Sequence, residues 1–190
     1  MKLIGSYPSP FVRRIRMLLH HIDYEFVPID IFSNDGRKIL DTYGPVAKIP
    51  IFEHDNNVIW DSLQIALYLK NKTLVDFSLS LEESKHIIAI NELTDSGVLL
   101  FQLKKFQLDM EWKNAFSQNQ LRRVKNVFSW FENLPPLSWS IPGQWLYCTL
   151  DWLKFRQIYL WENDYPNLRK FYQGQQQRIE VIDTAPEKIS

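Results

Sequence analysis

The stretch GSYPSPFVRR, residues 5–14, decides the fold, because a short apolar strand ends in it and a helix begins in it. Residues 2–6 have the composition of a strand. Pro10 suits the first position of a helix, which makes Ser9 the N-cap. Residues 10–21 then place apolar side chains on one helical face (Phe11, Ile15, Leu18 and Leu19). The stretch therefore predicts a strand, a turn and a helix, with the Ser9 hydroxyl at the positive end of the helix dipole.

The alternation of strands and helices continues through the first half of the chain. It predicts a strand at residues 24–29 and a short helix at residues 35–43. A hairpin follows, with strands at residues 51–53 and 58–60 and its turn at residues 55–57, and then a closing helix at residues 62–70. A strand–helix–strand crossover joins parallel strands and a hairpin joins antiparallel ones. The order βαβαββα therefore predicts a mixed sheet in an α/β domain of residues 1–72.

The second half of the chain has helical signals only. Residues 73–80 read as a linker, and Ser80 with Glu83 forms a capping box that opens a helix towards residue 105. Further helices are expected over residues 112–133 and 144–159 and from Pro166, while the glutamine-rich QGQQQ near the end is expected to be a frayed tail. We therefore expect an all-helical domain over residues 81–190.

Composition excludes several classes of protein. The chain has 22 basic and 22 acidic residues, so no overall field attracts nucleic acid or an anionic membrane, and the arginines of residues 13–16 and 122–125 are expected on solvated helix faces. Cys148 is the single cysteine, which excludes a disulfide within this chain and a thiolate zinc cluster. The four histidines lack metal-binding spacing. With no signal-peptide pattern in residues 1–6, we expect a cytoplasmic protein without structural metal.

Three short motifs carry the candidate chemistry. Ser9 can accept a backbone N–H and still donate its own hydrogen to an anion such as a ligand thiolate. In AKIPIF, the residue before Pro50 is extended, and if the Ile49–Pro50 bond is cis, the Ile49 backbone turns towards the sheet edge and can pair with a peptide-like ligand. In WDSLQIALYL, Ser62 is the expected N-cap and Asp61 could meet an ammonium group, a pair that suits a zwitterionic amino-acid end. Taken singly, each motif also fits ordinary capping or strand initiation.

In their order and spacing, the three motifs resemble the cytosolic glutathione transferase family over nearly the whole chain, and SPFVR is closest to its bacterial serine-type members. The resemblance implies a thioredoxin-like first domain with glutathione as co-substrate. It implies that Ser9 activates the thiol, that Pro50 is cis and that the Ile49 backbone pairs with the cysteinyl part. It further implies that Asp61 and Ser62 hold the γ-glutamyl end. Lys48 and Phe11 complete the implied glutathione contacts.

The resemblance leaves several alternatives open. Tyr7 and, less directly, Ser6 are rivals of Ser9 as thiol donor. The family pattern Asn-Pro-x-Gly is replaced by Gly44 to Ala47, and the capping box of a central helix has Ser140 but Gly143 in place of its aspartate. The implied function is conjugation of glutathione to an apolar electrophile by a homodimer. A glutathione-dependent isomerase, peroxidase or dehalogenase, or a non-catalytic ligand carrier, remains possible. The second substrate is expected to face the part of the first long helix at residues 99–106.

Overall fold

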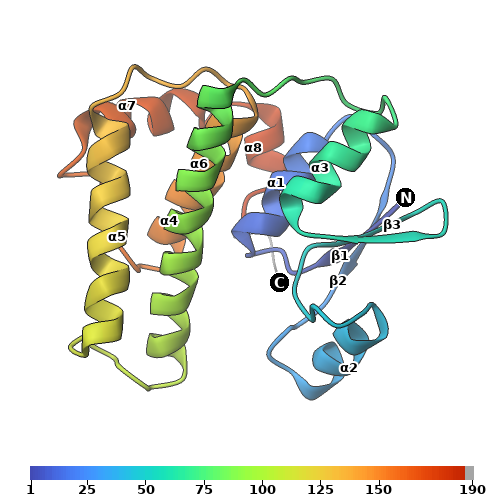
Figure 1. Ribbon diagram of the computed structural model, residues 1–190, viewed down its shortest axis with the longest axis horizontal. Helices are drawn as coiled ribbons and strands as arrows, with labels where there is room; N and C mark the ends of the chain where they lie inside the picture. Colours follow the sequence, from blue (N-terminus) through green and yellow to red (C-terminus); the bar gives the residue numbers. More distant parts are fainter. Residues whose placement is uncertain (187–190) are drawn as a thin grey trace. The chain divides into compact units, whose positions relative to one another are not determined.

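The computed structural model describes residues 1–186 of the 190. They form two compact units (Figure 1). The first unit comprises Met1–Phe77 together with the described residues from Arg178 onward, and the second comprises Ser78–Gln177.

The first unit is built on a four-stranded mixed sheet. Its strands are β1 (Lys2–Gly5), β2 (Glu25–Pro28), β3 (Ile51–His54) and β4 (Asn57–Trp60), in the spatial order β2-β1-β3-β4. β1 pairs parallel with β2 and antiparallel with β3, and β3 pairs antiparallel with β4. The hairpin turns at Asp55 and Asn56, whose φ angles of 49° and 58° are those of a tight primed turn. The expected mixed sheet is confirmed.

Helices cover both faces of this sheet. α1 (Pro10–Leu18) and α3 (Ser62–Asn71) lie on one face and α2 (Asn34–Thr42) lies on the other (Figure 1). Each strand contacts helices on both faces of the sheet, because consecutive side chains of a strand point to opposite faces. Leu3 packs with Val12, Ile15 and residues of α3, whereas the next residue, Ile4, packs with Leu40 of α2. The expected βαβαββα order is confirmed.

The second unit is all-helical. It contains α4 (Leu81–Lys105), α5 (Ala115–Glu132), α6 (Ile141–Phe155) and α7 (Pro166–Gln175). The capping box is present: the Glu83 N–H donates to Ser80 Oγ at 3.2 Å, and the Ser80 N–H donates to Glu83 Oε2 at 2.9 Å. Trp145, Trp161 and Phe128 are fully buried in the core of this unit. The thioredoxin-like domain and the helical domain expected from the sequence are therefore both present.

Three helix limits in the second unit differ from the sequence expectations. The second helix starts at Ala115 rather than at residue 112, because Asn114 caps it by accepting the Ser117 N–H. The third starts at Ile141, with Ser140 as the N-cap, and ends at Phe155 rather than at residue 159. The expected frayed glutamine tail was wrong, since α7 continues through Gly174 to Gln175.

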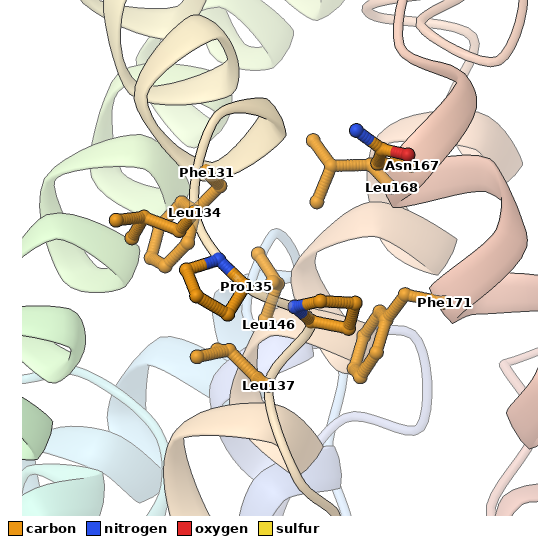
Figure 2. A pocket seen from close by; sticks show the side chains of 9 residues that line it. Phe131, Leu134, Pro135, Leu137, Leu146, Asn167, Leu168 and Phe171 are labelled. Carbon is orange, nitrogen blue, oxygen red and sulfur yellow. The ribbon is translucent and has the colours of Figure 1, made fainter.

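A short apolar crevice lies where α5 ends and α7 begins. Glu132, the last residue of α5, accepts the backbone N–H groups of Asn167 and Leu168 and so caps the first turn of α7. The crevice beside this contact has a volume of about 10 Å³, and Figure 2 shows the side chains that line it: Phe131, Leu134, Pro135, Leu137, Leu146, Asn167, Leu168 and Phe171. A space of this size holds one water at most, so it is a packing defect rather than a substrate pocket.

The last helix, α8 (Ile179–Asp183), returns to the first unit. This differs from the expected helical domain of residues 81–190, of which residues 187–190 lie outside the described part of the chain. Arg13 Nη2 donates to the Val181 carbonyl at 3.0 Å, and Arg16 Nη1 donates to the Thr184 carbonyl at 3.1 Å. These two carbonyls lie at the C-terminal end of α8, where backbone acceptors have no partner within the helix.

The arginines of α1 are buried, so the expectation that they lie on a solvated face was wrong. The exposed fractions of Arg13, Arg14 and Arg16 are 2%, 0% and 8%. The physical reason is the docking of α8, which supplies carbonyl acceptors for Arg13 and Arg16, and the Phe11 ring, which lies 4.5 Å from the Arg14 guanidinium. No helix among residues 1–186 combines the length and the apolar character that crossing a bilayer requires.

Candidate functional site

The three motifs lie at one end of the sheet. Ile4, Ile51 and Trp60 form one row across β1, β3 and β4. The segment leading to Ser9 leaves β1 just beyond this row, Pro50 enters β3 beside it, and Asp61 follows β4 directly. Strand pairing therefore brings together segments that are separated by about 40 and 10 residues in the sequence.

The Ser9 hydroxyl caps α1, as the sequence predicts. The Val12 N–H donates to Ser9 Oγ at 3.3 Å, and Ser9 has extended backbone angles of φ −75° and ψ 125°. Among the described residues, Ser9 Oγ makes no second hydrogen bond that would use its own hydrogen. The side chain is half-buried. It can therefore accept from the helix and donate outward at the same time.

Tyr7, the rival hydroxyl, is held through its ring. The Tyr7 ring lies 4.7 Å from the Phe26 ring in an edge-on contact, and the Arg16 guanidinium lies 5.0 Å from the Tyr7 ring centre. Burial lowers the pKa of Arg16, while the neighbouring Tyr24 and Tyr7 raise it. The tyrosine thus belongs to an aromatic and cationic cluster formed with β2 and α1.

The Ile49–Pro50 peptide bond is cis, as the resemblance implies. Pro50 is buried and Ile49 is half-buried. No backbone hydrogen bond to another described residue uses the N–H or the C=O of Ile49, although the chain on its C-terminal side enters the β3 ladder. A half-buried backbone without partners offers one donor and one acceptor to a peptide-like ligand.

Lys48 is exposed and has no hydrogen bond or ion pair with another described residue. It follows Ala47, whose φ of 48° lies in the left-handed region. A lysine in this position offers a mobile positive charge beside Ile49 and Pro50. It suits a ligand carboxylate without fixing its orientation.

Asp61, not Ser62, is the N-cap of α3, so the sequence expectation was wrong by one residue. Asp61 Oδ1 accepts the N–H groups of Leu63 at 2.8 Å and Gln64 at 3.4 Å. A carboxylate near two free N–H groups is a strong cap, and its negative charge complements the helix end. Ser62 becomes the first helical residue and is only 2% exposed.

The backbone of Asp61 is strained. Its φ of 71° and ψ of 131° lie outside the regions that L-residues ordinarily occupy. Such a conformation costs about 1–3 kcal/mol and persists where the surrounding structure imposes it, often at ligand sites. The strain turns the chain sharply from β4 into α3 and places the helix start at the end of the sheet.

The electrostatics of this end suit a ligand with both signs of charge. The N-termini of α1 and α3 both begin there, and helix N-termini attract anions. Lys48 adds a cation, and the Asp61 carboxylate is the one group of the three motifs that attracts an ammonium. A wider polar hollow of about 570 Å³ lies at the opposite end of the sheet, near the Lys2–Glu53 ion pair, and contains none of the three motifs.

Comparison with known proteins agrees with this geometry. Residues 3–73, which contain all three motifs, match the sequence model described as the N-terminal domain of glutathione S-transferase. A glutathione transferase family member from Pseudomonas fluorescens Pf-5, solved with bound glutathione, superimposes with a TM-score of 0.85 over 97% of this chain and 98% of that one, at 21% identity. The whole described chain thus has the glutathione S-transferase fold.

Among curated relatives, the chain is similar to two isomerases. A probable maleylacetoacetate isomerase of Caenorhabditis elegans is 36% identical over 50% of this chain, and the match spans 46% of that protein. The maleylacetoacetate isomerase of Mus musculus is 28% identical over 77% of this chain and 68% of that protein. The chain thus spans about half the length of the first of these relatives.

Sequence reasoning missed the contacts that position α1 in this transferase fold. The spacing of Arg13, Arg16 and His20 places them on one helical face, a pattern that could have indicated a buried cationic stripe. The partner, α8, was missed because no helix was expected after the QGQQQ stretch. His20, two residues after α1, adds a third contact to α8, since its Nε2 lies 2.9 Å from Asp183 Oδ2.

Proposed function

We propose that this protein is a glutathione transferase that binds glutathione at the shared end of β1, β3 and β4. The convergence of the three motifs at that end carries the proposal, because a tripeptide with two carboxylates, one ammonium and one thiol needs such a set of groups. The known fold and the glutathione bound by the Pseudomonas relative support it. As expected from the sequence, the protein is a cytoplasmic homodimer in this proposal.

Each part of glutathione has a proposed partner. The Ile49 backbone pairs with the cysteinyl residue. Asp61 receives the γ-glutamyl ammonium, and Ser62 with the N-terminus of α3 receives its carboxylate. Lys48 contacts the glycyl carboxylate. Phe11, in the first turn of α1 beside Arg14, contributes an apolar contact next to the thiol.

Ser9 is the proposed thiol activator. Its free hydrogen is donated to the glutathione sulfur, and the positive end of α1 adds to the stabilisation of the thiolate. Lowering a thiol pKa by about 2 units takes about 2.7 kcal/mol. A hydrogen bond to a charged group supplies about 1.5–3 kcal/mol and a helix end about 0.3–1 kcal/mol. The two contributions together are therefore sufficient.

In the proposed reaction, the thiol proton passes to solvent and the thiolate attacks an electrophilic carbon of the second substrate. With an aryl chloride, a carbon–sulfur bond forms, the carbon–chlorine bond breaks and chloride leaves with the bonding pair. The chemistry uses glutathione itself as the nucleophile, and Ser9 stays unmodified throughout.

The test is a comparison of Ser9→Ala with Tyr7→Phe. We expect wild-type protein to be retained on immobilised glutathione and to conjugate 1-chloro-2,4-dinitrobenzene. Ser9→Ala should lose more than about 10-fold in kcat while Tyr7→Phe changes little, because only Ser9 is proposed to reach the sulfur. The thiolate absorbance of bound glutathione should titrate at higher pH in Ser9→Ala. The reverse order of the two variants would assign the thiol to Tyr7.

A glutathione-dependent isomerase is the second candidate, and the similarity to two maleylacetoacetate isomerases favours it. An isomerase uses the thiolate to add to a double bond and releases it again after rotation, so glutathione is not consumed. Thiol titration during turnover of maleylacetoacetate separates the two activities: constant thiol indicates isomerisation, and one thiol lost per turnover indicates conjugation. Calorimetry showing no glutathione binding would instead favour a ligand carrier.

A further inference from the structure

The loop between α4 and α5 displays apolar side chains to solvent. It joins the two helices at one end of the second unit, where they lie side by side (Figure 1). Phe106, Leu108 and Met110 lie in the loop and Phe116 is the second residue of α5; their exposed fractions run from 46% for Phe106 to 71% for Leu108. We call residues 104–117 the tip. Exposed apolar side chains gathered in one short segment mark an interaction surface.

The exposure of these side chains does not come from a loosely held loop. Asp109 accepts the backbone N–H of Lys113 at 2.9 Å and also the hydroxyl of Ser117, which ties the loop to the first turn of α5. Trp112 is half-buried, and its Nε1 donates to the Leu100 carbonyl of α4 at 3.2 Å. The tip is therefore fixed to both helices in a conformation that buries part of its indole and leaves its other apolar side chains outside.

The charged side chains of the tip give it a basic edge. The tip contains three lysines and two acidic residues. Both acidic side chains have partners within the tip, since Asp109 accepts the hydrogen bonds described above and Glu111 forms an ion pair with Lys113. Lys104 and Lys105 are exposed in the last turn of α4, next to the apolar side chains. The tip therefore combines protruding apolar surface with positive charge at its border.

A lipid surface with anionic headgroups fits this combination. The tip is a protrusion rather than a groove, since neither of the two hollows described above includes a residue of it. Apolar side chains that protrude can enter the boundary between headgroups and acyl chains, while lysines at their border attract anionic lipids. A second copy of the tip fits less well, because its lysines would face lysines.

We propose that the tip binds the surface of an anionic membrane, with Leu108 and Met110 inserted among the lipids and Lys104 and Lys105 at the headgroups. The membrane is bound at its surface and is not crossed, in agreement with the lack of a spanning helix among residues 1–186. The chain has equal numbers of basic and acidic residues, so the attraction is local and weakens with added salt. The proposal is independent of glutathione binding.

Co-sedimentation of the full chain with vesicles tests the proposal. The mixed vesicles contain equal parts of phosphatidylcholine and phosphatidylserine, and the neutral vesicles contain phosphatidylcholine alone. We expect wild-type protein to bind the mixed vesicles at least about 10-fold more tightly than the neutral ones. Leu108→Gln with Met110→Gln should weaken binding to the mixed vesicles at least about 10-fold, because two inserted side chains are lost. Leu81→Gln with Ile88→Gln is the matched control, because it removes two comparably exposed apolar side chains from α4 outside the tip, and it should change binding less than about 2-fold.

A second set of variants tests the lysines. Lys104→Gln with Lys105→Gln should weaken binding to the mixed vesicles at least about 5-fold and change binding to the neutral ones less than about 2-fold, because only the mixed vesicles offer anionic headgroups. Arg122→Gln with Lys125→Gln removes the same charge from exposed positions farther along α5 and should change binding to either vesicle less than about 2-fold. Equal losses in the two double variants would show that overall charge, not the tip, is responsible, and would overturn the proposal.

Sedimentation velocity without vesicles separates a membrane from a second copy of the chain as the partner of the tip. We expect Leu108→Gln with Met110→Gln to keep the oligomeric state of wild-type protein. If this variant lost self-association while wild-type protein did not bind the mixed vesicles, the tip would be a contact between copies and the proposal would be wrong. Equal binding of wild-type protein to mixed and neutral vesicles would also overturn it. None of these measurements depends on glutathione, so the proposed function can fail while this proposal stands, and the reverse.

Discussion

Ala47 and Asp61 flank the proposed glutathione site, and both have positive φ angles without being glycine. For Asp61 the side chain compensates, since its carboxylate accepts two N–H groups of α3. The methyl group of Ala47 has no such contribution to make, and a left-handed backbone costs an L-residue about 1–2 kcal/mol. The resemblance to the glutathione transferase family agrees with this strain, because the family pattern has glycine, which adopts a positive φ readily, at the place of Ala47.

Ala47→Gly is therefore expected to stabilise the protein by about 0.5–1 kcal/mol, the relief of backbone strain less the entropy that glycine gains in the unfolded chain. Ala66→Gly is the matched control. Ala66 is fully buried in α3, where glycine is about 1 kcal/mol less favourable than alanine. Urea unfolding of both variants measures the contrast. If the two substitutions changed stability in the same direction, the backbone of residue 47 would not be under strain.

Arg156 illustrates how far residue types alone carry an interpretation. Its basic charge near the end of α6 suggests a solvated helix terminus, whereas its guanidinium lies 4.8 Å from the centre of the Phe101 ring. This contact depends on Phe101, more than fifty residues earlier in the chain, whose ring meets the guanidinium only after α4 and α6 have packed. Ser9, Ile49 and Asp61 were proposed from the sequence because local motifs mark them, whereas Arg156 has no local motif.

At the scale of elements, α6 begins without a side-chain cap. Ser140 occupies the N-cap position, but its hydroxyl makes no capping hydrogen bond, and Gly143 stands where the family pattern has an aspartate. The structure explains the glycine: a Cβ at residue 143 would lie 2.0 Å from the carbonyl oxygen of Ser138. The chain entering α6 thus packs directly against its first turn and occupies the space of the usual carboxylate.

Gly143→Asp should accordingly destabilise the protein by about 2–3 kcal/mol, although it restores the family's capping sequence, because the added atoms overlap a backbone carbonyl. Gly143→Ala should lose nearly as much. Gly174→Ala is the control, because nothing lies within 4 Å of its added Cβ and alanine is the better helix former. Thermal unfolding compares the three variants. A gain in stability from Gly143→Asp would mean that the segment before α6 moves aside easily.

Most elements were predictable because their signals are local. The periodicity of α1, the primed turn of the β3–β4 hairpin and the Ser80–Glu83 capping box all act within a few residues. The wrong predictions concern residues whose structure depends on neighbouring elements rather than on the local sequence. The cap of α3 moved to Asp61 because β4 ends directly before it, and the buried arginines of α1 depend on acceptors about 170 residues later.

At the scale of the whole molecule, the chain leaves the first unit after Phe77 and rejoins it at Arg178. α8 alone is too short to be a stable helix in water. It is held because Arg13 and Arg16 donate four hydrogen bonds to its last turn, two to Thr184 and one each to the carbonyls of Val181 and Asp183. The same contacts satisfy the two guanidinium groups, which are otherwise enclosed.

Removal of the chain from Arg178 onward should therefore destabilise the first unit more than the small size of α8 suggests. Truncation removes the four acceptors that α8 and Thr184 offer to the buried guanidinium groups of Arg13 and Arg16, and an unsatisfied buried donor costs about 1–3 kcal/mol. We expect the free energy of unfolding to fall by at least about 3 kcal/mol, measured by urea unfolding of the shortened and full chains. A double variant, Arg13→Met with Arg16→Met, should recover part of this loss in the shortened chain and destabilise the full chain, because methionine fills similar volume without donors. Equal effects of the double variant in both backgrounds would show that the arginines and α8 stabilise the unit independently.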